Sequence, residues 1–280
     1  MKEGAGRKAA ATGGVRYLLR AYGALMAARW SELLQYRASV FLWTLWSLAG
    51  PIIHLSVWSA VARARGEIAG YGMGDIAAYF LIQSVVYHFT VAWQAYEFGY
   101  LIRTGTLSAR LLKPFDPSHY IVAQNVSFKL INLIWLIPIW AGMFSYFRPP
   151  IELSPGRLFA FGVALGAAAL LQFLWVHCFA MLAFWTVRAD ALYDLTETVA
   201  FFIGGGIAPV AFLPAAVKGL AQYLPFYYVV GFPIEVGAGS IPWEQVWRGV
   251  AVTLAWAAVF FGLYRVLWRL GIRRYGAVGA

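Results

Sequence analysis

The sequence predicts an all-α integral membrane protein with six transmembrane helices, an N-terminal interfacial amphipathic helix and a re-entrant helical segment before the last span. Hydrophobic residues make up 61% of the 280 positions and charged residues only 12%, whereas soluble domains carry about 25% charged residues. Aromatic residues reach 18%, which is typical of Trp and Tyr side chains gathered at the two membrane interfaces. An ordinary soluble domain is therefore excluded, and no nucleic-acid partner is expected.

The N-terminal region has two parts. Residues 1–14 are small and basic and lack the apolar core of a signal peptide, so we expect a disordered cytoplasmic tail. From 15 to 37 apolar side chains recur at helical spacing with arginines between them. This pattern predicts an amphipathic helix that lies in the inner interface of the membrane.

Six apolar runs are long enough to cross a bilayer, since a crossing needs about 20 residues. They lie near 38–61, 76–98, 119–147, 157–187, 198–217 and 247–270. Together they predict a transmembrane domain over 38–270, followed by a cytoplasmic tail at 271–280.

The basic residues are divided unequally between the two sides of the membrane. Seven precede the first span, three lie in the 99–118 loop, one is Arg188 and four lie at the C-terminal end, which makes fifteen on one side against six on the other. The positive-inside rule then places both termini in the cytoplasm of a cell (inner or plasma) membrane protein. The 188–197 loop is acidic, but acidic residues contribute little to orientation. We expect this loop to form a second cytoplasmic surface of opposite charge.

The short basic loop between the second and third spans is built to dock against a soluble partner. Gly105 permits a turn, Ser108 can cap a short helix, and leucines including Leu112 recur at helical spacing before Pro114. The predicted docking residues are Arg103, Gly105, Leu107, Ser108, Arg110, Leu111 and Lys113.

Polar residues form one stripe on the second span. Their spacing of 4, 3, 4 and 3 residues places them on one helical face. The stripe consists of Gln83, Tyr87, Thr90, Gln94 and Glu97. Polar side chains at membrane depth must face protein or water, so the stripe is either a pathway lining or dimer seam, or a set of hydrogen bonds between helices of one subunit.

Glu97 and Lys129 carry charge within or near the predicted spans. One hypothesis is that they form an ion pair across the hairpin between the second and third spans. The other is that Lys129 extends its ammonium to the inner headgroups.

The segment 207–235 is too apolar for a solvated loop and too interrupted for a straight span. We expect it to form re-entrant or interfacial helices that are buried against protein and seal or gate the outer end. The interrupting residues are Gly204, Gly205, Gly206, Pro209, Pro214, Pro225 and Pro233. The three glycines beside Pro209 predict a hinge, with close helix packing as the alternative.

These features together resemble the permease subunits of type 2 ABC exporters. The resemblance rests on the amphipathic helix before the first span, the basic loop after the second and the Pro-broken segment before the last. The string LSARLLKP at Leu107 to Pro114 is similar to the corresponding loop of an uncharacterised multidrug-type branch. The resemblance implies that the segment from Arg103 to Lys113 is a coupling helix and that the helix at 15–37 is the connecting helix. It further implies as partners an ATP-binding subunit, a second permease subunit and the surrounding membrane lipid.

The chain has no motif that binds nucleotide. A phosphate-binding loop of the form Gly-x-x-x-x-Gly-Lys-Ser/Thr is absent from the whole sequence. The export hypothesis therefore predicts a non-enzymatic permease without a cofactor of its own, and it requires ATP and Mg in a partner subunit.

Other chemistry has weaker support in the sequence. Gly72-Met73-Gly74-Asp75 and Tyr193-Asp194 resemble aspartyl protease motifs, but their order is reversed and they fall on opposite sides of the membrane. The four histidines lie in four separate segments and there is only one cysteine, Cys178, so we expect no metal site and no internal disulfide. A membrane-embedded enzyme that acts on lipid remains the alternative to export.

Overall fold

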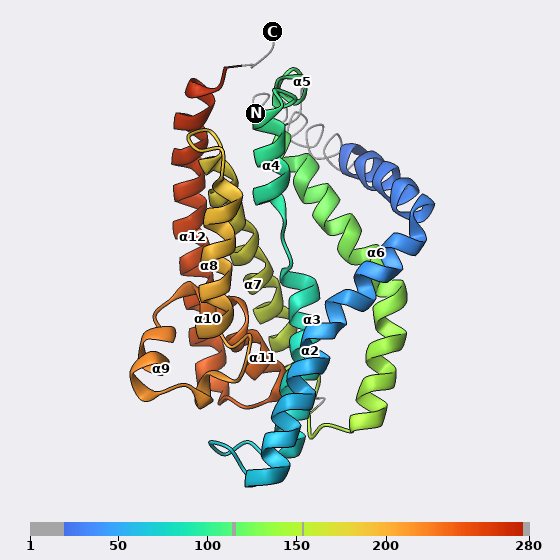
Figure 1. The fold of residues 1–280 in the computed structure, drawn as a ribbon, viewed down its shortest axis with the longest axis vertical. Coiled ribbons are helices and arrows are strands. Elements are labelled where there is room, and N and C mark those ends of the chain that lie inside the picture. Colours follow the sequence, from blue (N-terminus) through green and yellow to red (C-terminus); the bar gives the residue numbers. More distant parts are fainter. Residues whose placement is uncertain (1–19, 114–115, 153, 277–280) are drawn as a thin grey trace, which may run out of the picture. The chain divides into compact units, whose positions relative to one another are not determined.

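A computed structural model of the chain describes residues 20–113, 116–152 and 154–276 (Figure 1). The regular elements of these residues are helices, which confirms the predicted all-α class. The chain divides into two compact units. The first unit is Met1–Thr44 with Ala109–Ile137, and the second unit is Leu45–Ser108 with Pro138–Ala280. The predicted tail at 1–14, the start of the connecting helix and the last four residues lie outside the described residues.

Five helical stretches of the described residues are long and apolar enough to cross a membrane. They are α2 (Arg37–Arg65), α3 (Met73–Thr90) continued by α4 (Gln94–Arg103), α6 (Pro117–Phe147), α7 (Pro155–Leu182) and α12 (Trp243–Arg274). Each coincides with one of the six predicted spans. The predicted count of six is not confirmed.

The exception is the run predicted as a span over 198–217. Here α8 (Ala189–Ile203) has only 15 residues and begins within the acidic stretch that the sequence suggested was a loop. Gly205 follows with a φ of 97°, which an α-helix cannot accommodate. The chain then forms the 3₁₀ turn η1 (Val210–Phe212), α9 (Ala215–Ala221), α10 (Pro225–Val229) and α11 (Gly231–Ala238). A straight span at 198–217 is therefore wrong, whereas the predicted series of short helices over 207–235 is present.

The prolines of this segment start helices rather than interrupt them. Pro209 and Pro214 immediately precede η1 and α9, and Pro225 is the first residue of α10. Proline suits these positions because its fixed φ fits the first helical turn, where its missing N–H leaves no hydrogen bond unmade.

The first unit joins the N-terminal helix to α6. Residues 20–35 are helical, as predicted for the described part of 15–37. The Tyr22 hydroxyl lies 2.7 Å from His119 Nδ1, and Trp30 Nε1 donates to the Ser127 carbonyl oxygen at 3.3 Å. Leu33 and Val40 pack against Ile131 beside these contacts. The helix is thus fixed along α6 by both polar and apolar contacts, while its place in the membrane interface stays a prediction.

In the second unit α7 is the central helix. It packs along the length of α12 and also contacts α3, α4 and α11 (Figure 1). α11 also approaches α12 closely: a Cβ on Gly249 of α12 would lie 2.1 Å from the Phe232 ring of α11. Near the starts of α7 and α12, the Arg157 guanidinium lies 4.9 Å from the Trp243 ring centroid. Since α7 and α12 both start at this end, they run parallel, and the segment between them must return along the bundle.

Candidate functional site

The basic loop predicted to dock is built from two helices rather than one. α4 ends at Arg103, Gly105 turns the chain with a φ of 72°, and α5 (Leu107–Leu111) follows. The prediction of a single helix from Arg103 to Lys113 is therefore wrong in extent, because a residue with positive φ ends α4. Ser108 lies inside the first turn of α5, so it does not cap the helix as predicted.

The leucines of this segment do not form one buried face. Leu107 is fully buried, whereas Leu111 is 37% exposed and Leu112 is 88% exposed. The sequence pattern identified the buried anchor correctly. The two exposed leucines leave apolar surface at the end of α5.

Tyr275, at the end of α12, holds the turn that precedes α5. Its hydroxyl donates to the Gly105 carbonyl oxygen at 2.9 Å and lies 3.1 Å from the Ser108 hydroxyl. Because the single Tyr275 proton goes to Gly105, Ser108 is the donor in the second bond. The Tyr275 ring packs edge-on against Phe184, with centroids 6.1 Å apart. The sequence analysis did not identify Tyr275 as a contact of the loop. The only sequence feature that marks it is its position just after Arg273 and Arg274, at the cytoplasmic end predicted for the last span.

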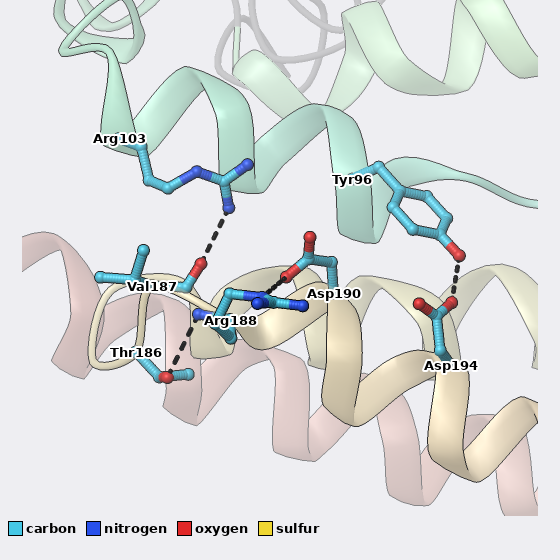
Figure 2. Close-up of polar contacts among 7 residues, drawn as sticks. All are labelled: Tyr96, Arg103, Thr186, Val187, Arg188, Asp190 and Asp194. Carbon is cyan, nitrogen blue, oxygen red and sulfur yellow. Dashed lines mark hydrogen bonds and ion pairs between the residues drawn. The ribbon is translucent and has the colours of Figure 1, made fainter.

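Arg103 connects the same turn to the segment between α7 and α8. Its Nη1 donates to the Val187 carbonyl oxygen at 3.0 Å (Figure 2). The guanidinium reaches across Gly99, where a Cβ would lie 3.0 Å from Nη1. A basic residue predicted to face a soluble partner thus also makes a contact inside this subunit.

The start of α8 carries the acidic residues of the predicted second surface. Arg188 pairs with Asp190 at 3.8 Å, and the Tyr96 hydroxyl of α4 donates to Asp194 (Figure 2). Asp190 lies in the first turn of α8, where the helix dipole favours a negative charge. Asp194 therefore links α8 to α4, whereas Asp190 pairs with the residue that precedes its own helix.

A cavity of about 620 Å³ lies among these elements. The walls come from the end of α4, the 183–187 connection and the end of α12. The lining includes Arg103, Phe184, Trp185, Val187, Arg274 and Tyr275. All these elements belong to the second unit, so one end of this unit is a hollow, basic and aromatic surface.

The remaining basic residues of the loop lie in the first unit. The guanidinium of Arg110 and the ammonium of Lys113 approach the Tyr120 ring, at 5.8 and 5.3 Å from its centroid. Such cation–π contacts contribute about 0.5–1 kcal/mol at exposed sites. Tyr120 therefore positions both cations beside the start of α6.

The polar stripe is divided by a break in the second span. α3 ends at Thr90 and α4 begins at Gln94, so the five residues do not share one continuous helix. Gln83 donates to the Gly206 carbonyl oxygen at 2.7 Å, and Gln94 donates to the Phe173 carbonyl oxygen at 2.9 Å. Both side chains are buried in the second unit. These bonds favour hydrogen bonding between helices of one subunit at Gln83 and Gln94, and a pathway or dimer-seam role of the stripe remains a prediction.

The glycine segment after α8 is held closely. The Tyr79 hydroxyl donates to the Gly205 carbonyl oxygen at 2.8 Å, and Gly231 N donates to the Gly204 carbonyl oxygen at 2.9 Å. A Cβ on Gly206 would lie 2.5 Å from the Phe201 ring. The contacts favour close packing, and a hinge at these glycines remains a prediction.

The residues of the rival motifs have local structural roles. Asp75 Oδ2 accepts a hydrogen bond from Gly72 N at 3.0 Å at the start of α3, and Asp194 accepts from Tyr96. The Cys178 thiol donates to the Phe260 carbonyl oxygen at 3.3 Å. Pairing of Glu97 with Lys129 would join the two units and stays a prediction.

The family model described as ABC-2 family transporter protein matches residues 48–279. The chain therefore belongs to the ABC-2 transporter family, and it is the multi-pass membrane component of an ABC transporter. Membership implies a separate ATP-binding subunit as partner. A search of curated proteins found no match.

Proposed function

We propose that this chain is the permease subunit of an exporter of the multidrug-type branch, with the segment from Arg103 to Lys113 as its coupling element. In this proposal the partner subunit binds ATP and Mg, and two permease subunits surround the pathway. Both termini and α5 face the cytoplasm, as the excess of basic residues on that side predicts.

The observation that carries the proposal is the attachment of the turn before α5 to two other helices. Tyr275 joins this turn to the end of α12, and Arg103 joins it to the connection between α7 and α8. A displacement of α5 by a soluble partner would break these hydrogen bonds unless α12 and α8 moved with it. The geometry thus gives closure of the ATP-binding subunits a route into the membrane helices.

The parallel course of α7 and α12 supports an even total number of membrane crossings, because the chain must cross the membrane once more between these two helices. The chain leaves α7 beside Arg103 and must return to the opposite end before α12 begins. We infer that α8 and the short helices after it complete this return as a discontinuous sixth crossing. Non-helical backbone at membrane depth is tolerated where it is buried in protein, and Gly204 and Gly205 have hydrogen-bonded carbonyl oxygens.

Membership of the ABC-2 family also favours export over the alternative of a lipid-modifying enzyme. The acidic residues that would have served such an enzyme are engaged in fixing α8. Asp190 pairs with Arg188, and Asp194 accepts from Tyr96.

Crosslinking tests whether α5 contacts the ATP-binding subunit. Leu112→Cys places a thiol at the most exposed leucine of the segment, and the natural Cys178 is buried. We expect a short bifunctional thiol–amine reagent to join Leu112→Cys to a copurifying ATP-binding subunit. Leu220→Cys, on α9 at the opposite end of the second unit, is the matched control and should not crosslink. Equal crosslinking at both positions, or at neither, would contradict the proposal.

Charge reversal tests the coupling role. We expect Arg110→Glu or Lys113→Glu to leave the protein folded and inserted but to reduce the ATPase activity of the assembled complex about tenfold, because a favourable charge contact becomes repulsive. Arg65→Glu reverses an exposed charge at the end of α2, as Lys113→Glu does in the loop, and should have no such effect. Unchanged ATPase activity and unchanged subunit association in both loop variants would exclude the segment as the coupling element.

A further inference from the structure

A second cavity lies at the end of the second unit opposite α5. Its volume is about 300 Å³, and it is lined by residues of η1, α9, α10, α11 and the first turn of α12 together with Tyr71. This volume is at the lower end of the range for small-molecule pockets. The cavity therefore fits a small polar molecule or a single polar group of a larger one.

A buried carboxylate forms part of its wall. Glu235 of α11 is only 8% exposed, and the Tyr227 hydroxyl donates to its Oε2 at 2.5 Å. An ionised carboxylate at such a site is stable only when it has further partners. The carboxylate of Glu235 is thus suited to receive a cation.

Lys218 brings the opposite charge to the same cavity. It lies on α9 with an exposed side chain and acts electrostatically on Glu235. Among the described residues no ion pair within 4.0 Å joins the two. The cavity is therefore lined by one negative and one positive group that are not paired with each other. Neutral donors and acceptors also line it, including Gln222, Gln245 and Tyr71.

We propose that this cavity binds a small zwitterion, with a primary ammonium on Glu235 and an anionic group on Lys218. A simple cation would be repelled by Lys218 and a simple anion by Glu235, whereas a zwitterion satisfies both charges without adding net charge. The Gln222 and Gln245 amides supply hydrogen bonds to either end. The site lies outside the coupling surface, so the proposal goes beyond the proposed function and does not depend on it.

Aminophosphate chemistry meets these requirements from two sources. Free phosphoethanolamine carries an ammonium and a phosphate monoester on one soluble molecule, and phosphatidylethanolamine carries an ammonium and a phosphodiester, with no net charge, in its lipid headgroup. The two sources differ in whether the group needs a bilayer to reach the cavity, so the test includes both.

Binding measurements on the full-length protein, purified with its copurifying subunits in nanodiscs, test the proposal. The soluble probes are phosphoethanolamine, ethanolamine and inorganic phosphate, measured by calorimetry in phosphatidylglycerol nanodiscs. Retention of phosphatidylethanolamine against phosphatidylglycerol is measured by native mass spectrometry. We expect the aminophosphate to bind more tightly than either half alone, and retention of the lipid without binding of the free zwitterion would assign the lipid as its source.

Two variants and a control locate the site. Glu235→Gln should weaken aminophosphate binding about tenfold or more, because a charge-assisted contact is lost. Lys218→Met should remove the preference for phosphoethanolamine, or for the phosphate-bearing lipid group, over ethanolamine. Glu244→Gln changes an exposed carboxylate at the start of α12 and should bind as the unmodified protein does.

The proposal is overturned if neither aminophosphate binds, if ethanolamine or phosphate alone binds equally well, or if Glu235→Gln and Lys218→Met bind as the unmodified protein does. Thermal unfolding shows whether Glu235→Gln is folded. If Glu235→Gln does not fold, the binding measured for Lys218→Met alone tests the proposal, because Lys218 is exposed and its replacement should not disturb packing.

Discussion

At the scale of single residues, one hydroxyl and one carboxylate make the most specific contacts of the second unit. Tyr275 ties the turn at Gly105 to the end of α12, and Glu235 is buried beside Tyr227 at the other end. Neither residue stands out in the sequence: Tyr275 contacts a turn 170 residues away along the chain, and Glu235 meets Tyr227 through the packing of two short helices. Local periodicity cannot reveal such contacts.

Tyr275→Phe is expected to loosen α5 without disturbing the fold. The change removes the hydrogen bonds to the Gly105 carbonyl oxygen and the Ser108 hydroxyl but keeps the ring against Phe184. A hydrogen bond contributes about 1 kcal/mol net, so amide protection around α5 should fall roughly fivefold or more in hydrogen exchange. Tyr223→Phe, on a Tyr 79% exposed, should leave this protection unchanged. Unaltered exchange in Tyr275→Phe would remove this residue from the coupling argument.

At the scale of elements, the apolar runs predicted the long helices well and their interruptions poorly. Five of the six predicted runs coincide with helices of spanning length, because about 20 apolar residues have few other stable arrangements. The break between α3 and α4 falls at Val91–Trp93, where no Gly or Pro signals it. Its cause is tertiary, since Ala92 and Ala95 pack against Trp175 of α7.

The run at 198–217 failed for a different reason. Its composition is apolar enough for a span, but three consecutive glycines follow α8 and permit the chain to turn. The turn is stabilised by Tyr79 and Gln83 of α3, more than a hundred residues away in the sequence. Apolarity predicted the burial of this segment, and only the tertiary contacts determine its path.

Gly205→Ala is expected to destabilise this turn. The φ of 97° is strained for alanine, and its Cβ would lie 2.6 Å from the Tyr79 hydroxyl. Backbone strain alone costs about 1–3 kcal/mol, and the clash adds to it, so the unfolding midpoint in detergent should fall by several degrees. Gly219→Ala, in α9 with nothing within 4 Å of the new Cβ, should be neutral or stabilising. A folded Gly205→Ala protein with normal stability but lost transport would instead support the hinge interpretation.

At the scale of the whole molecule, charge and helix direction favour the same proposed topology. The excess of basic residues predicts that α5 and both termini lie on one side of the membrane, and the parallel α7 and α12 require the chain to return between them. The charge count uses only the distribution of basic side chains, whereas the helix directions come from contacts within the second unit, so the two predictions are independent. An odd number of membrane crossings would agree with neither of them.

Thiol labelling in intact cells decides this topology. Leu112→Cys should react with a membrane-impermeant maleimide only after the cells are permeabilised, whereas Leu220→Cys should react in intact cells, since the two residues lie on opposite sides. Both positions are exposed, and the natural Cys178 is buried, so background labelling is low. Labelling of Leu112→Cys in intact cells would invert the orientation. Labelling of both only after permeabilisation would mean that α9 never reaches the outer side and that the zwitterion cavity opens to the cytoplasm.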